Sequence, residues 1–318
     1  MENQSSVTES AVKEFILLGF SDIRELQILH FWVFLFIYLA AIIGNFLIIL
    51  IVAHDEQLHS PMYFFLANLS LSDTCYISTT VPKSIASALT NHSLISFTEC
   101  VLQVFLILTL AGVELSFLTV MAYDRYMAIC HPLQYSMIMN WKACFQMAAA
   151  SWISSLINAT LHTVSTFRLQ FCKSNIKQLF CDIPQLWMIS CTDPVVSQSL
   201  VIASTITVGL FCLLFILVSY GFIFSTVFKI QSSQGRYKVF STCTPHLTVL
   251  SLFLTTAVFS YFRPKAWSSP PVDLFAAVLY TILPPVMNPI IYSLRNKEIH
   301  GAMSKMAKKW FGFYRGIL

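Results

Sequence analysis

Charged side chains are scarce in this sequence. Only 11% of the 318 residues are Asp, Glu, Lys or Arg, whereas 56% are hydrophobic. A soluble domain carries about 25% charged residues, because its core needs a polar shell around it. The shortage of charge excludes a large soluble domain and indicates a chain that lies mostly in a lipid bilayer.

Motifs of the common enzymes are also missing. The chain has no Gly-x-Ser-x-Gly nucleophile turn, no His-Glu-x-x-His zinc helix and no glycine-rich phosphate loop. Close Cys-x-x-Cys pairs and neighbouring His pairs are absent, so the cysteines do not form a zinc motif. We therefore do not expect an enzyme.

Long apolar runs, in contrast, are abundant. About 20 apolar residues in a helix cross the hydrocarbon core of a bilayer. Seven such runs are present, at 28–53, 59–82, 98–123, 142–163, 196–228, 239–262 and 272–294. We predict an all-α membrane protein, a seven-transmembrane helix bundle over 28–294. An extracellular N-terminal segment over 1–27 and a cytoplasmic tail over 295–318 would flank it.

The charges at the two ends favour one orientation. The stretch "MENQSSVTES" lacks a basic start before a short apolar run, so we expect no cleaved signal peptide and a first span that acts as a signal-anchor. The tail is basic, which places it inside the cell. Its cations, against the single acid Glu298, are Arg295, Lys297, Lys305, Lys308, Lys309 and Arg315.

The tail also has a helical pattern. Ile299, Met303, Met306 and Trp310 recur at helical spacing, with lysines between them. This pattern predicts a short amphipathic helix on the inner membrane surface after the seventh span.

Cysteines and glycosylation sequons agree with this orientation. Four cysteines fall on the outer side, and an even number there predicts two disulfides in one of three pairings. They are Cys100, Cys172, Cys181 and Cys191. Asn3 and Asn91 begin Asn-x-Ser sequons on the same side and are predicted to carry glycans.

Several polar residues lie inside the apolar runs, where they are costly and therefore indicate function. They include Asp73, Glu114, Asn45 and Asn288. The carboxylates could bind a cation together with an Asn, relay protons, or stay protonated and hydrogen-bonded for packing. The residues alone leave these three alternatives open.

The stretch "MAYDRYMAIC" places Asp124 and Arg125 at the inner end of the third run. An arginine there often only reaches for lipid headgroups. Its acidic neighbour can instead hold the guanidinium by a charge-assisted hydrogen bond, which would make the pair a switch element. Pro289 in the seventh run frees a backbone carbonyl, which neighbours must satisfy, and Tyr292 follows one turn later.

These pieces together resemble a rhodopsin-type G-protein-coupled receptor. More narrowly, "PMYFFLANLSLSD", "MAYDRYMAICHPLQY", "KVFSTCTPHL" and "PPVMNPIIYSLRN" resemble the motifs of vertebrate odorant receptors. The resemblance covers nearly the whole chain, and the "KVFSTCTPHL" motif is similar to that of the tetrapod-type class II branch.

The resemblance implies roles for the matching positions. It pairs Cys100 with Cys181 and Cys172 with Cys191. It assigns Asp73, Glu114 and Asn288 to a sodium-linked polar cluster, so that Na⁺ is the one ion expected and no other cofactor is. The implied activation switch consists of Asp124, Arg125, Tyr220, His246, Asn288, Pro289 and Tyr292, with Lys238 near it.

An odorant pocket is implied among the outer halves of four spans. By position its residues are Ile107, Leu108, Ala111, Gly112, Ser204, Thr205, Val208, Leu254, Ala257, Val258, Tyr261 and Thr281. These side chains are mostly apolar with a few hydroxyls, which suits a small, volatile, weakly polar molecule. We expect some of them to serve only in helix packing.

Two residues depart from the family pattern. Leu254 stands in Phe-Leu-Thr where the family commonly has Phe-Tyr-Gly, so a ligand contact that depends on a tyrosine is lost. Pro245 stands where serine is more usual, which allows a kink just before His246.

We therefore predict an odorant receptor of the olfactory neuron plasma membrane, expected in the cilia. Its partners would be an odorant, a stimulatory olfactory-type G protein that raises cyclic AMP, and the membrane, with no nucleic acid. One alternative is a receptor for a metabolite outside the nose. A proton- or ion-coupled transporter would need inverted repeats, and the proline-rich seventh run has no counterpart in the other half.

Overall fold

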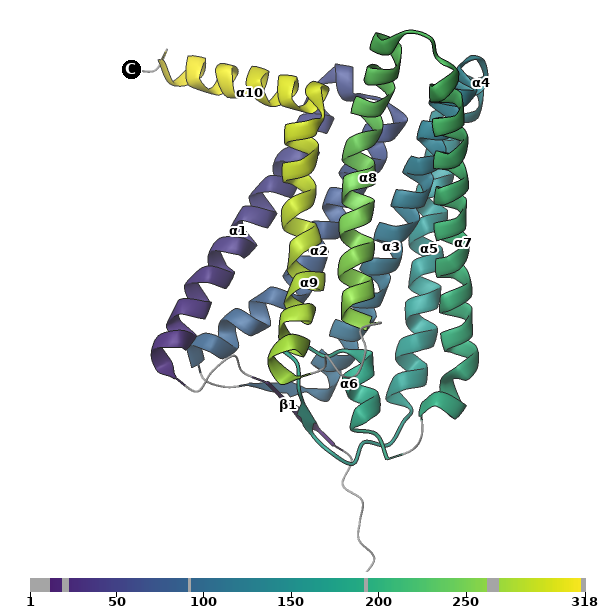
Figure 1. The fold of residues 1–318 in the computed structure, drawn as a ribbon. Coiled ribbons are helices and arrows are strands. Elements are labelled where there is room, and N and C mark those ends of the chain that lie inside the picture. Colours follow the sequence, from purple (N-terminus) through teal and green to yellow (C-terminus); the bar gives the residue numbers. More distant parts are fainter. Residues whose placement is uncertain (1–11, 19–22, 91–92, 192–193, 262–268, 316–318) are drawn as a thin grey trace, which may run out of the picture.

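The computed structural model describes residues 12–18, 23–90, 93–191, 194–261 and 269–315. Within these ranges, seven long helices run side by side (Figure 1). They are α1 (Arg24–His54), α2 (Pro61–Thr90), α3 (Phe97–Cys130), α5 (Trp141–Phe167), α7 (Pro194–Lys229), α8 (Ser233–Tyr261) and α9 (Pro270–Arg295). Each helix overlaps one predicted span, so the predicted bundle is confirmed.

Five of these helices, α1, α3, α7, α8 and α9, are long and apolar enough by composition alone to cross a membrane. Serines and threonines make α2 and α5 more polar. Many of these hydroxyls donate to the carbonyl four residues earlier, as Thr74 and Ser151 do at 2.9 Å. A hydroxyl satisfied within its own helix is compatible with a lipid environment.

Three short helical elements were not predicted from the sequence. They are η1 (Glu56–Leu58), α4 (Pro132–Ile138) and α6 (Ile183–Met188). One or two turns are too short to show hydrophobic periodicity. A proline in the first turn is the local signal that α4 and α6 share.

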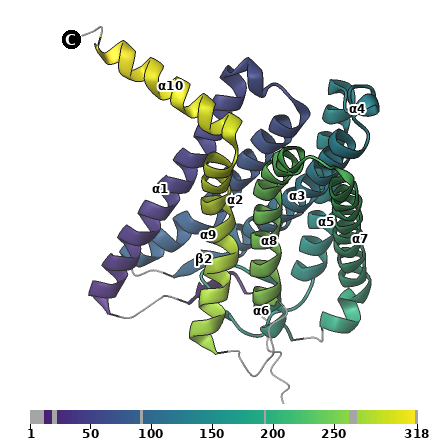
Figure 2. The same cartoon turned by 45° about the horizontal axis from the view of Figure 1, so that its top comes forward.

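A three-stranded sheet covers the outer end of the bundle, at the opposite end from α10 (Figures 1 and 2). Its middle strand β1 (Glu14–Leu17) pairs antiparallel with β2 (Leu94–Ser96) and parallel with β3 (Asn175–Ile176). Phe15 of β1 is completely buried and lies 5.5 Å from Phe171, between ring centroids. The sheet therefore has an apolar core of its own.

After α9 the chain turns away from the bundle into α10 (Lys297–Arg315), as both views show (Figures 1 and 2). Ile299 and Ala302 are buried against the bundle, and Lys305 Nζ lies 2.8 Å from Gln57 Oε1. The predicted helix in the tail is confirmed. The side chains of Lys309 and Trp310 lie outside the described part.

Small residues let the helices approach closely, as is usual where lipid gives no hydrophobic drive for helix association. A Cβ atom added at Gly44 of α1 would lie 3.0 Å from Pro289 Cγ of α9. At Gly112 of α3 it would lie 3.0 Å from Ser155 Oγ of α5. Both glycines therefore set the spacing of a helix pair.

Candidate functional site

A polar cluster lies in the middle of the bundle. Asn288 of α9 donates from Nδ2 to Asp73 Oδ2 of α2 at 2.9 Å and to Glu114 Oε1 of α3 at 3.4 Å. All three side chains are at most 4% exposed. Asp73 Oδ1 and Asn288 Oδ1 are buried and accept no hydrogen bond from the described residues. Free oxygens beside two carboxyl groups are ligands that suit a hard cation.

Asn45 satisfies the carbonyl that Pro289 leaves without a partner. Pro289 has no N–H, so the carbonyl of Pro285, four residues earlier, has no donor in its own helix. Asn45 Nδ2 donates to that carbonyl at 2.8 Å and to Ala41 O at 3.0 Å. The predicted need for a neighbouring donor is thus confirmed, and α1 supplies it.

At the inner end of α3, Asp124 holds Arg125. Arg125 Nε donates to Asp124 Oδ2 at 2.9 Å, and Nη2 reaches the same oxygen. Tyr135 of α4 donates to the other oxygen, Oδ1, at 2.7 Å. Asp124 is fully buried, so these donors offset the cost of burying its charge. Burial and the neighbouring Asp124 raise the pKa of Tyr135.

Tyr220 of α7 and His246 of α8 form a second buried contact. His246 is fully buried, and its Nε2 lies 3.0 Å from the carbonyl of Leu118. A carbonyl only accepts, so Nε2 carries a proton, and Nδ1 lies 2.6 Å from the Tyr220 hydroxyl oxygen. The imidazole therefore links α3, α7 and α8. Tyr292 of α9 is also buried, and no described residue bonds its hydroxyl.

A cavity of about 890 Å³ opens on the inner face beside Arg125. Tyr63, Tyr135, Tyr237, Lys238, Lys297 and Glu298 also line it. Side-chain contacts cross its rim. Tyr63 donates to Glu298 Oε2 at 2.5 Å, and Lys297 Nζ lies 5.8 Å from the ring centroid of Tyr237. These contacts tie α2 and α8 to the start of α10.

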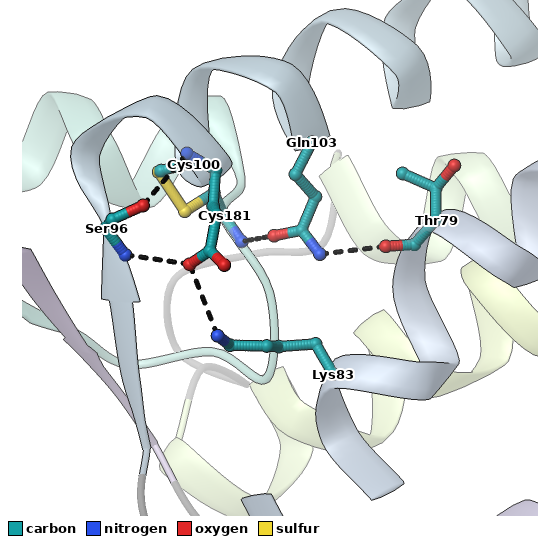
Figure 3. The surroundings of a disulfide bond; sticks show 7 residues. Thr79, Lys83, Ser96, Cys100, Gln103 and Cys181 are labelled. Carbon is teal, nitrogen blue, oxygen red and sulfur yellow. Dashed lines mark hydrogen bonds and ion pairs between the residues drawn. A yellow bond between two sulfur atoms is a disulfide. The ribbon is translucent and has the colours of Figure 1, made fainter. Parts of the chain in front are cut away.

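At the outer end, a disulfide joins Cys100 of α3 to Cys181 of the loop before α6 (Figure 3). Gln103 of α3 bonds both the same loop and α2: its Oε1 accepts from Cys181 N at 2.8 Å and its Nε2 donates to Thr79 O at 3.0 Å. Glu99 accepts from Ser96 N at 3.0 Å and pairs with Lys83 at 3.3 Å. Figure 3 shows the disulfide inside this polar frame.

The second disulfide joins Cys172 to Cys191 within the outer loop. Both pairings are those that the family resemblance implies. The two predicted glycosylation sites, Asn3 and Asn91, lie outside the described residues.

The residues of the predicted odorant pocket are not in one kind of environment. Ile107 and Ala111 of α3 pack in a cluster with Phe180 of the outer loop and Ala277 of α9. The remaining members differ in exposure. Thr281 is buried, Leu108, Gly112, Leu254 and Ala257 are half-buried, Ser204, Thr205, Val208 and Val258 are exposed, and the Tyr261 side chain lies outside the described part.

Three side chains of the predicted pocket have partners within the bundle. Thr205 donates to Asn158 of α5 at 3.3 Å and also contacts His162 there. Thr281 donates to Ala277 O of its own helix at 2.8 Å. Leu254 packs against the large inner core cluster. The structure therefore turns Thr205 towards α5.

Sequence reasoning missed Tyr135, Tyr63 and Gln103. Tyr135 stands within the "MAYDRYMAICHPLQY" motif, eleven residues after Asp124, and Pro132 between them marks the new helix that brings it back. No comparable local signal points to Gln103, because its partners are two backbone groups far away in the chain.

Comparison with known proteins agrees with this geometry. The sequence profile of the family described as "Olfactory receptor" matches residues 34–309. Human olfactory receptor 14I1 is 50% identical over 97% of this chain and 98% of its own length. Human olfactory receptor 14C36 is 48% identical over 95% and 97%, and gorilla olfactory receptor 1G1 is 46% identical over 93% and 95%.

Together, the family match, the seven-helix bundle and the two outer disulfides give one conclusion. The protein is a multi-pass receptor of the plasma membrane and not an enzyme. This chain belongs to the olfactory receptor family of G-protein-coupled receptors.

Proposed function

We propose that this receptor activates a stimulatory olfactory-type G protein, and so raises cyclic AMP, when an odorant binds in the outer half of the bundle. The observation that carries this proposal is the arrangement of Arg125. It lines the inner cavity, yet its guanidinium is bonded to Asp124. Release from Asp124 would turn a cationic side chain towards a partner in that cavity.

Tyr135 and the Tyr220–His246 contact would make the change cooperative. His246 joins α8 to α3 through the carbonyl of Leu118, so displacement of the inner end of α8 breaks that bond. An odorant shifts the population only by its differential affinity for the two arrangements. A micromolar ligand binds with about 8 kcal/mol, of which a few kcal/mol are sufficient.

The odorant would lie between α3, α7, α8 and α9, against the predicted pocket residues. Ile107 and Ala111 would supply apolar contact area for a small volatile molecule. Ser204 and Thr281 would offer hydroxyls. The expected ligand is weakly polar and uncharged, because none of the predicted residues carries a charge.

Na⁺ would bind in the polar cluster and stabilise the inactive state of the receptor. Asp73, Glu114 and Asn288 would hold it, and the unbonded Asp73 Oδ1 and Asn288 Oδ1 support the fit. Thermal unfolding of purified receptor with Na⁺ exchanged for a large organic cation tests this. A melting temperature that rises with Na⁺ in the parent and not in Asp73→Asn supports the site, and an equal rise in both contradicts it.

The receptor proposal is tested by recording cyclic AMP in cells that express the receptor with the olfactory G protein, across a panel of volatile compounds. Arg125→Ala should abolish the response while surface staining is retained. Lys142→Ala is the matched control, because Lys142 is an exposed cation at the inner start of α5. A response that survives Arg125→Ala would overturn the role of Arg125, and one that vanishes in both variants would show a general defect.

A further inference from the structure

A groove lies on the outer half of the bundle, between α5 and α7. Its volume is about 620 Å³. Among the described residues, its lining consists of Thr160, Leu161, Val164, Ser165, Arg168, Leu169 and Val201. All but Val201 follow one stripe of α5 and its C-terminal end, because residues three and four apart share a helix face.

The wall of the groove is apolar and faces outward. Leu161 and Val164 are 55% and 44% exposed, although both are aliphatic. The Thr160 hydroxyl donates to Leu156 O at 2.8 Å, so it is satisfied within its own helix. In a membrane protein, such a surface lies against lipid chains.

Arg168 lies at the outer end of this wall. It is the C-terminal cap of α5, its side chain is exposed, and no described residue bonds its guanidinium. Leu161 is seven residues earlier in the chain, which is about 10 Å along the helix axis. The cation therefore lies at the outer end of the apolar wall, where the headgroup of an outer-leaflet lipid would lie.

The groove is closed on its inner side by protein. Thr205 lies one helical turn deeper than Val201 on α7 and is bonded to Asn158 and His162 of α5. Polar contacts therefore join the two helices on the cytoplasmic side of the groove.

We propose that this groove binds one phospholipid of the outer leaflet, with its phosphate on Arg168 and one acyl chain along Leu161 and Val164. A guanidinium binds phosphate through charge-assisted, often bidentate hydrogen bonds. A groove volume of about 620 Å³ accommodates the glycerol phosphate region and the upper part of one acyl chain but not a whole lipid.

Native mass spectrometry of the purified full-length receptor tests the proposal. Dioleoylphosphatidylcholine is titrated in, and dioleoylglycerol, which has the same chains and no phosphate, is titrated in parallel. Arg168→Ala should weaken phosphatidylcholine binding about five- to tenfold and leave dioleoylglycerol binding unchanged. Arg168→Lys should retain most of the binding, and Val164→Trp, which fills the groove, should weaken the binding of both lipids.

The matched control is Lys173→Ala, which removes an exposed cation of the outer loop that does not line the groove. Equal losses in Lys173→Ala and Arg168→Ala would overturn the proposal, because general surface charge would then explain binding. Phosphatidylcholine binding that is unchanged in Arg168→Ala would also overturn it. A receptor dimer lost in Val164→Trp, without any lipid effect, would assign the groove to a second copy of the chain instead.

Discussion

The two ends of the bundle are held together by different kinds of bond. At the outer end, two disulfides and a three-stranded sheet fix the loops over a buried aromatic core. At the inner end, hydrogen bonds, the ion pair of Asp124 with Arg125 and a cation–π contact surround an open cavity. Covalent and strand contacts resist rearrangement, whereas individual polar contacts at a wet cavity exchange readily. The molecule is therefore built to change shape at its inner end.

The largest effect should follow from loss of the disulfide between α3 and the outer loop. Cys100 and Cys181 are 81 residues apart, against 19 for Cys172 and Cys191. Chain-entropy arguments give about 4.5 kcal/mol for the longer loop and about 3 kcal/mol for the shorter one. Cys100→Ser/Cys181→Ser should thus abolish surface delivery, measured by staining of intact cells. Equal or greater loss in Cys172→Ser/Cys191→Ser would contradict this order.

A smaller loss of stability is expected from overpacking the contact between α1 and α9, which lies between the two ends of the bundle. Gly44→Ala places a methyl group 3.0 Å from Pro289 Cγ, and overpacking of this kind costs about 1–3 kcal/mol. The melting temperature of the purified receptor should fall. Gly221→Ala is the control, because no atom lies within 4 Å of a Cβ at that position. Similar melting temperatures for the two variants would show that α1 and α9 adjust freely.

At the inner end, a single lost hydrogen bond should raise activity rather than reduce delivery. Tyr135→Phe removes the 2.7 Å bond to Asp124, and a bond to a charged group contributes about 1.5–3 kcal/mol. Basal cyclic AMP, normalised to surface receptor, should rise several-fold. Tyr126→Phe is the control, since that hydroxyl contacts His131 instead. An unchanged basal cyclic AMP signal in Tyr135→Phe would show that Tyr135 does not stabilise the inactive arrangement of the receptor.

The smallest effect should come from the rim of the inner cavity. The contact between Lys297 and the exposed Tyr237 ring is worth about 0.5–1 kcal/mol. Lys297→Ala should therefore raise basal cyclic AMP about two- to fivefold, and Lys297→Arg should leave it near the parent level. Tyr237→Leu combined with Lys297→Ala should add nothing to the single change. Additive increases would show that the two residues act separately.

The sequence predicted the long helices well and the short elements poorly, for a physical reason. A run of about 20 apolar residues is visible in composition alone, so the seven long helices could be located without knowledge of their neighbours. These helices are α1, α2, α3, α5, α7, α8 and α9. The strand β3 has two residues, Asn175 and Ile176, and exists only because β1 lies beside it. No local pattern can encode such a pair.

The same distinction applies to the candidate site. Asp73, Glu114 and Asn288 were identified because polar residues stand out in apolar runs, and hydrogen bonds do join them. Thr205 was placed in the pocket by position, whereas its hydroxyl turns to Asn158 of α5. The rotation of a helix about its axis depends on its neighbours, which the sequence of that helix does not specify.

The position of β1 has a consequence for how this chain is made. Ile16 emerges from the ribosome first, but its partners Leu94 and Asn175 are synthesised about 80 and 160 residues later. The pairing of the middle strand on the outer side of the membrane stays incomplete until both β2 and β3 have been translocated. β1, the first strand of the sheet to be made, thus completes its pairing only when β3, the last strand, has been made. The outer end is completed only after the fourth long helix is in the membrane.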